Sequence, residues 1–533
     1  MPQQRLLLAA AVFVLLAGGG CHGFHTEEAT IDAIQEGFKN GSLTSTALVR
    51  FYLDRISRLN PLLHAVIEVN PDALRQAAQA DAERYSGRCC HRCGRGLHGI
   101  PVLLKDNIAT RDRLNTTAGS LALLGSVVRR DAGVVARLRR AGAVVLGKAN
   151  MEEWANFRNL EGVHGWSARG GQGRNPYVLS ADPCGSSTGS AIAAAANMAA
   201  VTLGTETDGS ILCPASLNSV VGIKPTLGLT SRAGVIPISP RQDTVGPICR
   251  TMSDAVRVLD AIVGYDSLDG IATKKASRYI PRGGYMQFLR TDGLRGKRIG
   301  IPNGFFNYRN GTVQHMVFRQ HLDTMRKHGA ILIENIDIAN LSVILDVLNN
   351  GEQIVLPAEF KLSLDGYLSD LSHSPVHSLA DIIAFNNAHP VEERLKEFGQ
   401  FIAHISRSVI VINAFERLKE FGQLIFLVAE NTSGIGSPER AAIEELNKLS
   451  AYGLEKLMKE LKLDAIVTPN DSASTILAIG GMPGITVPAG YGKLGVPFGI
   501  CFGGLKGYEP RLIEIAYAFE QATQVRKTPT FSP

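Results

Sequence analysis

The 533-residue chain carries little charge for its length and contains no long run of lysine or arginine. Charged residues make up 20% of the chain and hydrophobic residues 45%, which indicates a large buried core. The formal net charge is +6. Because electrostatic binding of nucleic acid needs a concentrated basic patch, the composition predicts no nucleic-acid partner.

No linker rich in proline, glycine or serine divides the chain, although its length would allow several domains. The 55 glycines and 24 prolines are spread throughout. Strands are predicted at 102–104, 143–146 and 201–205, helices at 132–141 and 188–200, a helix pair at 27–60 and one further helix at 71–85. Short apolar strands that alternate with helices predict an α/β fold with a sheet covered on both faces. We therefore expect one large α/β domain over residues 25–533.

Cysteine is scarce and irregularly spaced. Beyond Cys21 the chain has seven cysteines, an odd number without regular spacing, which does not predict a disulfide framework. Cys89, Cys90 and Cys93 resemble half of a zinc site, but no second C-x-x-C motif follows at a suitable distance. We expect a solvent-facing loop here, with the pairing of these cysteines left open, and we predict no metal and no cofactor.

The first 24 residues differ from the rest of the chain. Arg5 precedes an apolar run, Leu6–Leu16, and small residues follow at 17–20. This order is typical of a secretory signal peptide, and the run is too short to span a bilayer comfortably. We predict a signal peptide over 1–24, with an uncleaved anchor as the alternative, and no membrane span after its removal. The expected location is the secretory pathway or the extracellular space.

Entry into the secretory route would turn several N-x-S/T sequons into glycan acceptors. They include the sequons at Asn40, Asn310 and Asn431. The sequon at Asn115 lies ten positions after Lys105, and we expect it to be inaccessible.

One segment is repeated. The eight residues 393–400, ERLKEFGQ, recur unchanged at 416–423. Repeat architectures need more than two units, so we interpret 401–423 as a local insertion or as an artefact of the gene model.

The most informative residues are two glycine-rich stretches that carry serine, GSSTGS at 185–190 and TDGS at 207–210, with Lys105 upstream in GIPVLLKDN. A serine hydroxyl needs a base to remove its proton, and a desolvated lysine can replace histidine because burial disfavours the ammonium form. Ser210, Ser186 and Lys105 therefore offer a nucleophile, a proton relay and a base. No Gly-Lys-Ser/Thr follows the first stretch, which argues against phosphate binding.

These motifs, together with GTETDGSI at 204–211, GIKPT at 222–226 and GMPGITVPA at 481–489, resemble the amidase signature family. The similarity runs from about residue 30 to 525, and the form of the 204–211 motif is closest to the peptide-amidase-like branch. The resemblance implies a mixed, mainly parallel central sheet. The sequence differs from the family pattern at Asp208, where glycine is commoner, and at Leu212, where many relatives carry arginine.

The resemblance also implies the role of each site residue. Ser210 would attack the amide carbonyl, Ser186, which a cis peptide holds in place, would bridge Ser210 to the base, and Lys105 would be that base. The backbone N–H groups of Thr207, Asp208, Gly209 and Ser210 would form the oxyanion hole. Asp106 and Asn107 are expected to support the lysine loop through hydrogen bonds. We interpret Lys148 and Lys224 as structural.

The sequence thus predicts an amidohydrolase that cleaves a carboxylic acid amide to an acid and ammonia or an amine. Two alternatives remain, the A subunit of a tRNA-dependent amidotransferase and a non-catalytic binding module of the same fold. The substrate, a small-molecule or peptide amide, is not specified further, and neither is the oligomeric state.

Overall fold

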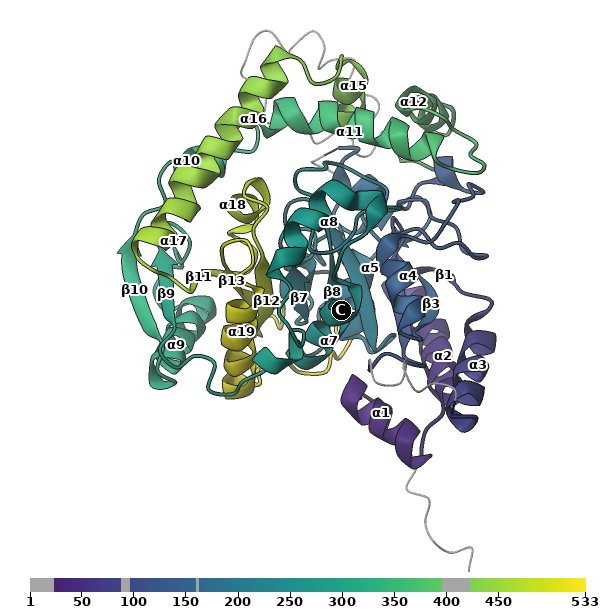
Figure 1. The fold of residues 1–533 in the computed structure, drawn as a ribbon, viewed down its shortest axis with the longest axis horizontal. Coiled ribbons are helices and arrows are strands. Elements are labelled where there is room, and N and C mark those ends of the chain that lie inside the picture. Colours follow the sequence, from purple (N-terminus) through teal and green to yellow (C-terminus); the bar gives the residue numbers. More distant parts are fainter. Residues whose placement is uncertain (1–23, 88–95, 160–162, 395–421) are drawn as a thin grey trace, which may run out of the picture.

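Short apolar runs of the chain form one 11-stranded sheet that organises the molecule (Figure 1). The computed structural model describes residues 24–87, 96–159, 163–394 and 422–533. Three predictions concern residues outside these ranges. They are the signal peptide except for its last residue, the cysteines at 89–93, and residues 401–421 of the repeated segment.

The sheet has the strand order β1-β3-β2-β6-β8-β7-β12-β13-β11-β9-β10, and β4 and β5 form a separate two-stranded sheet. The strands are β1 (Val66–Val69), β2 (Pro101–Lys105), β3 (Val144–Ala149), β4 (Trp166–Ser167), β5 (Gly171–Gln172), β6 (Val201–Glu206), β7 (Val221–Lys224), β8 (Thr244–Cys249), β9 (Arg298–Pro302), β10 (Ile331–Ile336), β11 (Ala465–Pro469), β12 (Gly484–Tyr491) and β13 (Pro497–Gly503). The three strands predicted from apolar runs are therefore present as β2, β3 and β6.

The sheet is mixed, as expected, but it is not mainly parallel. Six of its ten neighbouring strand pairs are antiparallel and four are parallel. The prediction was wrong on this point because β7, β8, β12 and β13 are joined as antiparallel neighbours in the centre of the sheet. An apolar run looks the same in either direction, so the pattern alone does not distinguish the two.

Helices cover both faces of the sheet. The α-helices are α1 (Ile31–Asn40), α2 (Ser45–Leu63), α3 (Ala73–Tyr85), α4 (Gly133–Arg140), α5 (Thr188–Ala195), α6 (Leu212–Leu217), α7 (Met252–Ile262), α8 (Gly270–Ala276), α9 (Val313–Lys327), α10 (Leu341–Ile344), α11 (Glu352–Ser369), α12 (Leu379–Ala388), α15 (Leu424–Glu430), α16 (Ser437–Ser450), α17 (Lys456–Glu460), α18 (Ser474–Ile479) and α19 (Glu509–Thr523). Strands β2, β6 and β8 are buried at every position, which requires cover on both sides.

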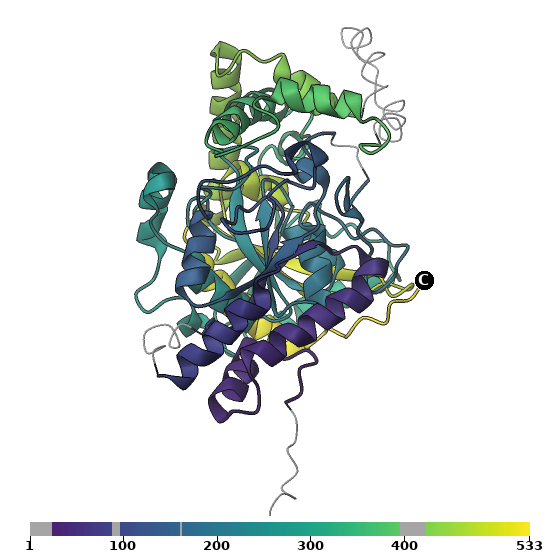
Figure 2. The same ribbon diagram turned by 90° about the vertical axis from the view of Figure 1, so that its right-hand side faces the viewer.

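The helical segments form separate groups around the sheet. Helices α5 and α6 contact each other and the central strands, while α7, α9 and α19 form a second group. Figures 1 and 2 place α11, α12, α15 and α16 together at one end of the molecule and α1 to α3 at the other. The predicted helix pair near the start is confirmed as α1 and α2. The first of these begins at a capping Thr30 and ends at Gly41, whose φ is 77°.

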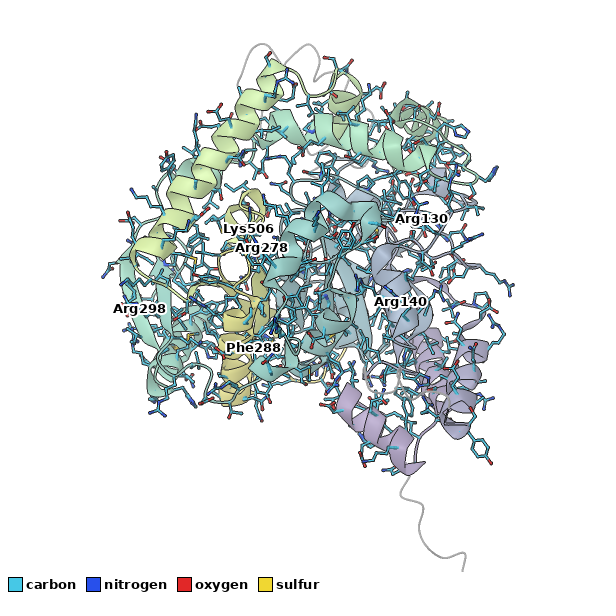
Figure 3. All side chains as sticks on the ribbon, viewed as in Figure 1. Arg130, Arg140, Arg278, Phe288, Arg298 and Lys506 are labelled. Carbon is cyan, nitrogen blue, oxygen red and sulfur yellow. A yellow bond between two sulfur atoms is a disulfide. The ribbon has the colours of Figure 1, made fainter. Side chains whose placement is uncertain are left out.

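Basic side chains are distributed over many elements. Figure 3 labels Arg130 and Arg140 beside α4, and Arg278 and Arg298 on two other parts of the fold. Among the described residues, no helix is long and apolar enough to cross a membrane.

Candidate active site

Lys105 is the last residue of β2, and its side chain is fully buried. In its protonated form, its Nζ donates hydrogen bonds to Ser186 Oγ at 2.8 Å, to Ser187 Oγ at 3.0 Å and to the carbonyl oxygen of Thr205 at 3.0 Å. Three acceptors therefore fix the position of the amine. β2 and β6 are parallel neighbours, so their carboxyl ends, Lys105 and Glu206, lie at the same edge of the sheet.

The surroundings of Lys105 favour the neutral amine. Burial lowers the pKa of Lys105 to about 7, while the negative charges of Glu152, Glu206 and Asp243 act in the opposite direction. An amine with this pKa is unprotonated in a large fraction of molecules near neutral pH, which is the requirement for a general base.

The segment before α5 brings Ser186 to this lysine. The Gly185–Ser186 peptide bond is cis, as the family resemblance implies. The backbone N–H of Glu152 donates to the carbonyl oxygen of Ser186 at 3.1 Å. A Cβ atom on Gly185 would lie 2.2 Å from Cδ of Glu152, so only glycine fits beside this buried carboxyl group.

Ser210 lies in the tight turn between β6 and α6, and it is 8% exposed. Gly209 adopts a φ of 76°, a backbone conformation that favours glycine. The carboxylate of Glu206 accepts hydrogen bonds from the N–H groups of Ile211 at 2.6 Å and Leu212 at 2.9 Å. Burial raises the pKa of Glu206 to about 7. The two ends of the turn are therefore connected through one buried side chain.

The two serine segments are in direct contact. The N–H of Ser187 donates to the carbonyl oxygen of Ser210 at 3.1 Å. The backbone N–H groups of residues 207–210 donate no hydrogen bond to any other residue that the structure describes. These four amides are thus available to an external acceptor such as an oxyanion.

Acidic side chains surround the same turn. Asp208 accepts a hydrogen bond from Thr475 Oγ1 at 2.7 Å, and Thr207 Oγ1 donates to Asp243 at 2.6 Å. A Cβ atom on Gly209 would lie 3.5 Å from Oδ2 of Asp471, whose pKa burial raises to about 6. Position 208, where glycine is commoner in the family, therefore carries a carboxylate on the turn. This carboxylate accepts a hydrogen bond from a hydroxyl group of α18.

Hydrogen bonds hold the loop that follows β2. Asp106 accepts hydrogen bonds from Thr117 Oγ1 at 2.5 Å and the Gly119 N–H at 2.9 Å, and Asn107 Nδ2 donates to Thr205 Oγ1 at 2.9 Å. The expectation that these two residues support the lysine loop through hydrogen bonds is confirmed.

Lys148 and Lys224 are both fully buried and donate to the backbone carbonyl oxygens of Ile108 and Met482.

Sequence reasoning missed four features of the site. It did not single out Ser187 or Thr205 as partners of Lys105, nor Glu152 and Glu206 as the carboxyl groups beside it. Ser187, Thr205 and Glu206 stand within the 185–190 and 204–211 motifs themselves, so their place in these motifs was an available signal. Glu152 had none, because it comes close only through the tertiary fold.

The sequence also did not predict one disulfide beside the site. Cys184 and Cys213 form a disulfide, with their Cα atoms 6.0 Å apart. Both cysteines stand in stretches adjacent to the serines, but an odd and irregular set of cysteines gives no pairing. Their proximity depends on how the 185–190 and 207–210 segments meet.

Comparison with known proteins agrees with this arrangement. The family model described as Amidase matches residues 47–425, a range that contains Lys105, Ser186 and Ser210. The chain is 58% identical to a probable amidase of Arabidopsis thaliana over 509 residues, which cover 95% of this chain and 92% of the relative. By class the protein is an amidohydrolase of the α/β type, which acts on carbon–nitrogen bonds. It belongs to the amidase signature family.

Two further comparisons bear on specificity. The native peptide amidase of Stenotrophomonas maltophilia has a similar structure, with a TM-score of 0.84 and 42% sequence identity, covering 96% of this chain and 100% of the other. The A subunit of the glutamyl-tRNA(Gln) amidotransferase of Bdellovibrio bacteriovorus is 29% identical over 516 residues, which cover 93% of this chain and 98% of the subunit.

Proposed function

We propose that this protein hydrolyses carboxylic acid amides through an acyl-enzyme formed on Ser210. Ser210 Oγ attacks the amide carbonyl carbon, while its proton passes to Ser186, whose own proton passes to the neutral amine of Lys105. The observation that carries the proposal is the 2.8 Å hydrogen bond between Lys105 Nζ and Ser186 Oγ at a buried site. A lysine with a pKa of about 7 is suited to accept a proton near neutral pH.

The turn at 207–210 supports the next step. Attack converts the carbonyl oxygen to an oxyanion, and the four backbone N–H groups of this turn, which donate to no other described residue, can donate to it. Collapse of the tetrahedral intermediate breaks the carbon–nitrogen bond, and the proton held by Lys105 returns through Ser186 to the departing amine. Water then attacks the acyl-enzyme by the same relay, giving the carboxylic acid and regenerating Ser210.

The substrate is proposed to be a primary amide of a small molecule or peptide. Support comes from the 42% identity to a structure described as a peptide amidase. C-terminal peptide amides are the first class to test, followed by aryl or indole acetamides and fatty acyl amides.

The two alternative functions have weaker support. The identity to the amidotransferase subunit is 29%, half of the 58% identity to the plant amidase. A non-catalytic module would not need a buried lysine held by two serine hydroxyls. Both alternatives predict that the isolated chain releases no ammonia from simple amides.

The test is ammonia release by the purified chain from a panel of primary amides that differ in their acyl group. Release is measured at constant pH, with each amide at the same concentration. We expect release from at least one class and none from the corresponding acids. Absence of release from the whole panel by folded protein would contradict the proposal.

We also propose that the protein passes through the secretory pathway. Disulfides persist in oxidising compartments, and the Cys184–Cys213 bond supports such a location. Asn40, Asn310 and Asn431 are exposed, whereas the Asn115 side chain is half-buried and donates to Glu68.

Glycosylation tests this location. Protein expressed from the full-length sequence in a eukaryotic host is expected to lose mass on treatment with an N-glycosidase. Substitution of Asn40, Asn310 and Asn431 by Gln should reduce that shift, and Asn115→Gln should leave it unchanged. Secreted or luminal protein without any glycan, or protein found only in the cytosol, would contradict this prediction.

A further inference from the structure

The Cys184–Cys213 disulfide joins the two segments that carry the proposed catalytic serines. Cys184 directly precedes the cis Gly185–Ser186 peptide, and Cys213 is the third residue after Ser210, in the first turn of α6. We propose that this bond is a positioning element of the active site, which holds Ser186 and Ser210 in register, so that its reduction lowers amide hydrolysis. This inference rests on the proposed function.

Apart from the apolar packing of α5 against α6, the remaining contacts between the two segments are hydrogen bonds. Asn218 Nδ2, at the end of α6, donates to the carbonyl oxygen of Pro183 at 2.8 Å, and the Ser187 N–H donates to the carbonyl oxygen of Ser210 at 3.1 Å. Each such bond contributes about 1 kcal/mol net and opens in local fluctuations, whereas a covalent bond does not. The disulfide therefore sets the range of motion between the relay serine and the nucleophile.

The geometry of the proton relay makes the site sensitive to such motion. Proton transfer from Ser210 to Ser186 needs the two hydroxyl groups within hydrogen-bonding reach during attack. A displacement of about 1 Å between reacting groups is sufficient to cost about 100-fold in rate. Because Lys105 holds Ser186 through a 2.8 Å hydrogen bond from β2, loss of the disulfide would release mainly the Ser210 turn and α6 from the fixed lysine.

Reduction of the bond by a dithiol is chemically direct. Cys184 is buried and Cys213 is half-buried, so a reductant thiolate attacks Sγ of Cys213 and expels Cys184 as a thiolate. The second thiol of the reductant then displaces Cys213 and closes a cyclic disulfide. The dithiol supplies two electrons and two protons, and the protein gains two thiols. Among the described cysteines, Cys249 and Cys501 are unpaired and buried.

The test compares oxidised wild type, dithiothreitol-treated wild type and the C184S/C213S double variant. Active sites are counted by labelling with a serine-reactive phosphonate probe, and kcat and KM for ammonia release are determined per labelled site. We expect kcat to fall about 10- to 100-fold in both altered forms, with KM changed much less. Dithiothreitol should have no further effect on the double variant, which identifies the bond as its target.

Cys249→Ala is the matched control, because it removes a buried cysteine that forms no disulfide, and it should keep wild-type kcat with or without dithiothreitol. Equal kcat per labelled site in the oxidised and reduced forms would overturn the inference, whatever happens to the melting temperature. If the double variant does not fold, reduced wild type with an unchanged circular dichroism spectrum gives the same comparison.

Failure of the proposed function has a different signature. In that case the oxidised wild type releases no ammonia from any amide. The rate of probe labelling at Ser210 still tests the positioning role, because it is expected to slow on reduction, and equal labelling rates in both forms would overturn the inference.

Discussion

Ser210→Ala is expected to reduce ammonia release by at least about 1,000-fold, because it removes the atom that forms the acyl-enzyme while leaving the rest of the site in place. The substitution deletes one hydroxyl group at a position that is 8% exposed. The fold should therefore be retained, and the turn should still offer its backbone N–H groups. The measurement is kcat/KM for the best amide of the panel, together with the melting temperature.

The control for this variant is Ser369→Ala, at the exposed end of α11, which should keep wild-type activity. Labelling by the serine-reactive probe should disappear in Ser210→Ala and persist in Ser369→Ala. Wild-type turnover by Ser210→Ala would show that another residue is the nucleophile.

Lys105→Met and Lys105→Arg are expected to lower kcat/KM by about 100- to 10,000-fold, the range for loss of a general base. Methionine has a similar length but no amine, and arginine keeps its proton at all accessible pH values. Ser187 Oγ still donates to the Thr205 carbonyl oxygen at 3.0 Å, so the strand end keeps a partner without the amine. Activity of Lys105→Arg close to that of wild type would exclude Lys105 as the base.

The pH dependence of wild type provides an independent measure of the same residue. Because burial lowers the pKa of Lys105 to about 7 and the base form is the unprotonated amine, kcat/KM should rise with pH and level off above pH 8. At pH 6, one unit below this pKa, it should be about tenfold below the plateau. The residual activity of Lys105→Met should lack this rise, and a wild-type maximum near pH 5 would contradict the assignment.

Local sequence patterns predicted much of the framework of the site. The apolar run before Lys105 predicted a buried strand, observed as β2, and the run 201–205 predicted β6. The turn between β6 and α6 could be recognised because its glycine, small residues and serine follow one another directly along the chain. The glycine is needed there because its φ is positive. The motifs were therefore readable from the sequence wherever their residues are contiguous.

The direction of the central strands was not predictable in the same way. Strands β7, β8, β12 and β13 have the apolar composition of buried strands, and such a pattern has no polarity along the chain. β7 pairs with β8 and β12 with β13 between strands that are close in sequence, whereas β12 and β7 bring together residues more than 200 positions apart, such as Ile485 and Ile223.

By itself, the sequence determined which chemical groups are present and in what order: one lysine at the end of an apolar run and two serines in glycine-rich turns. Only the tertiary structure decided that the lysine is buried, that Glu152 and Asp243 lie near it, and that Cys184 bonds to Cys213. The physical reason is that a pKa and a disulfide depend on distances through space. Those distances are set when segments remote in sequence pack against one another.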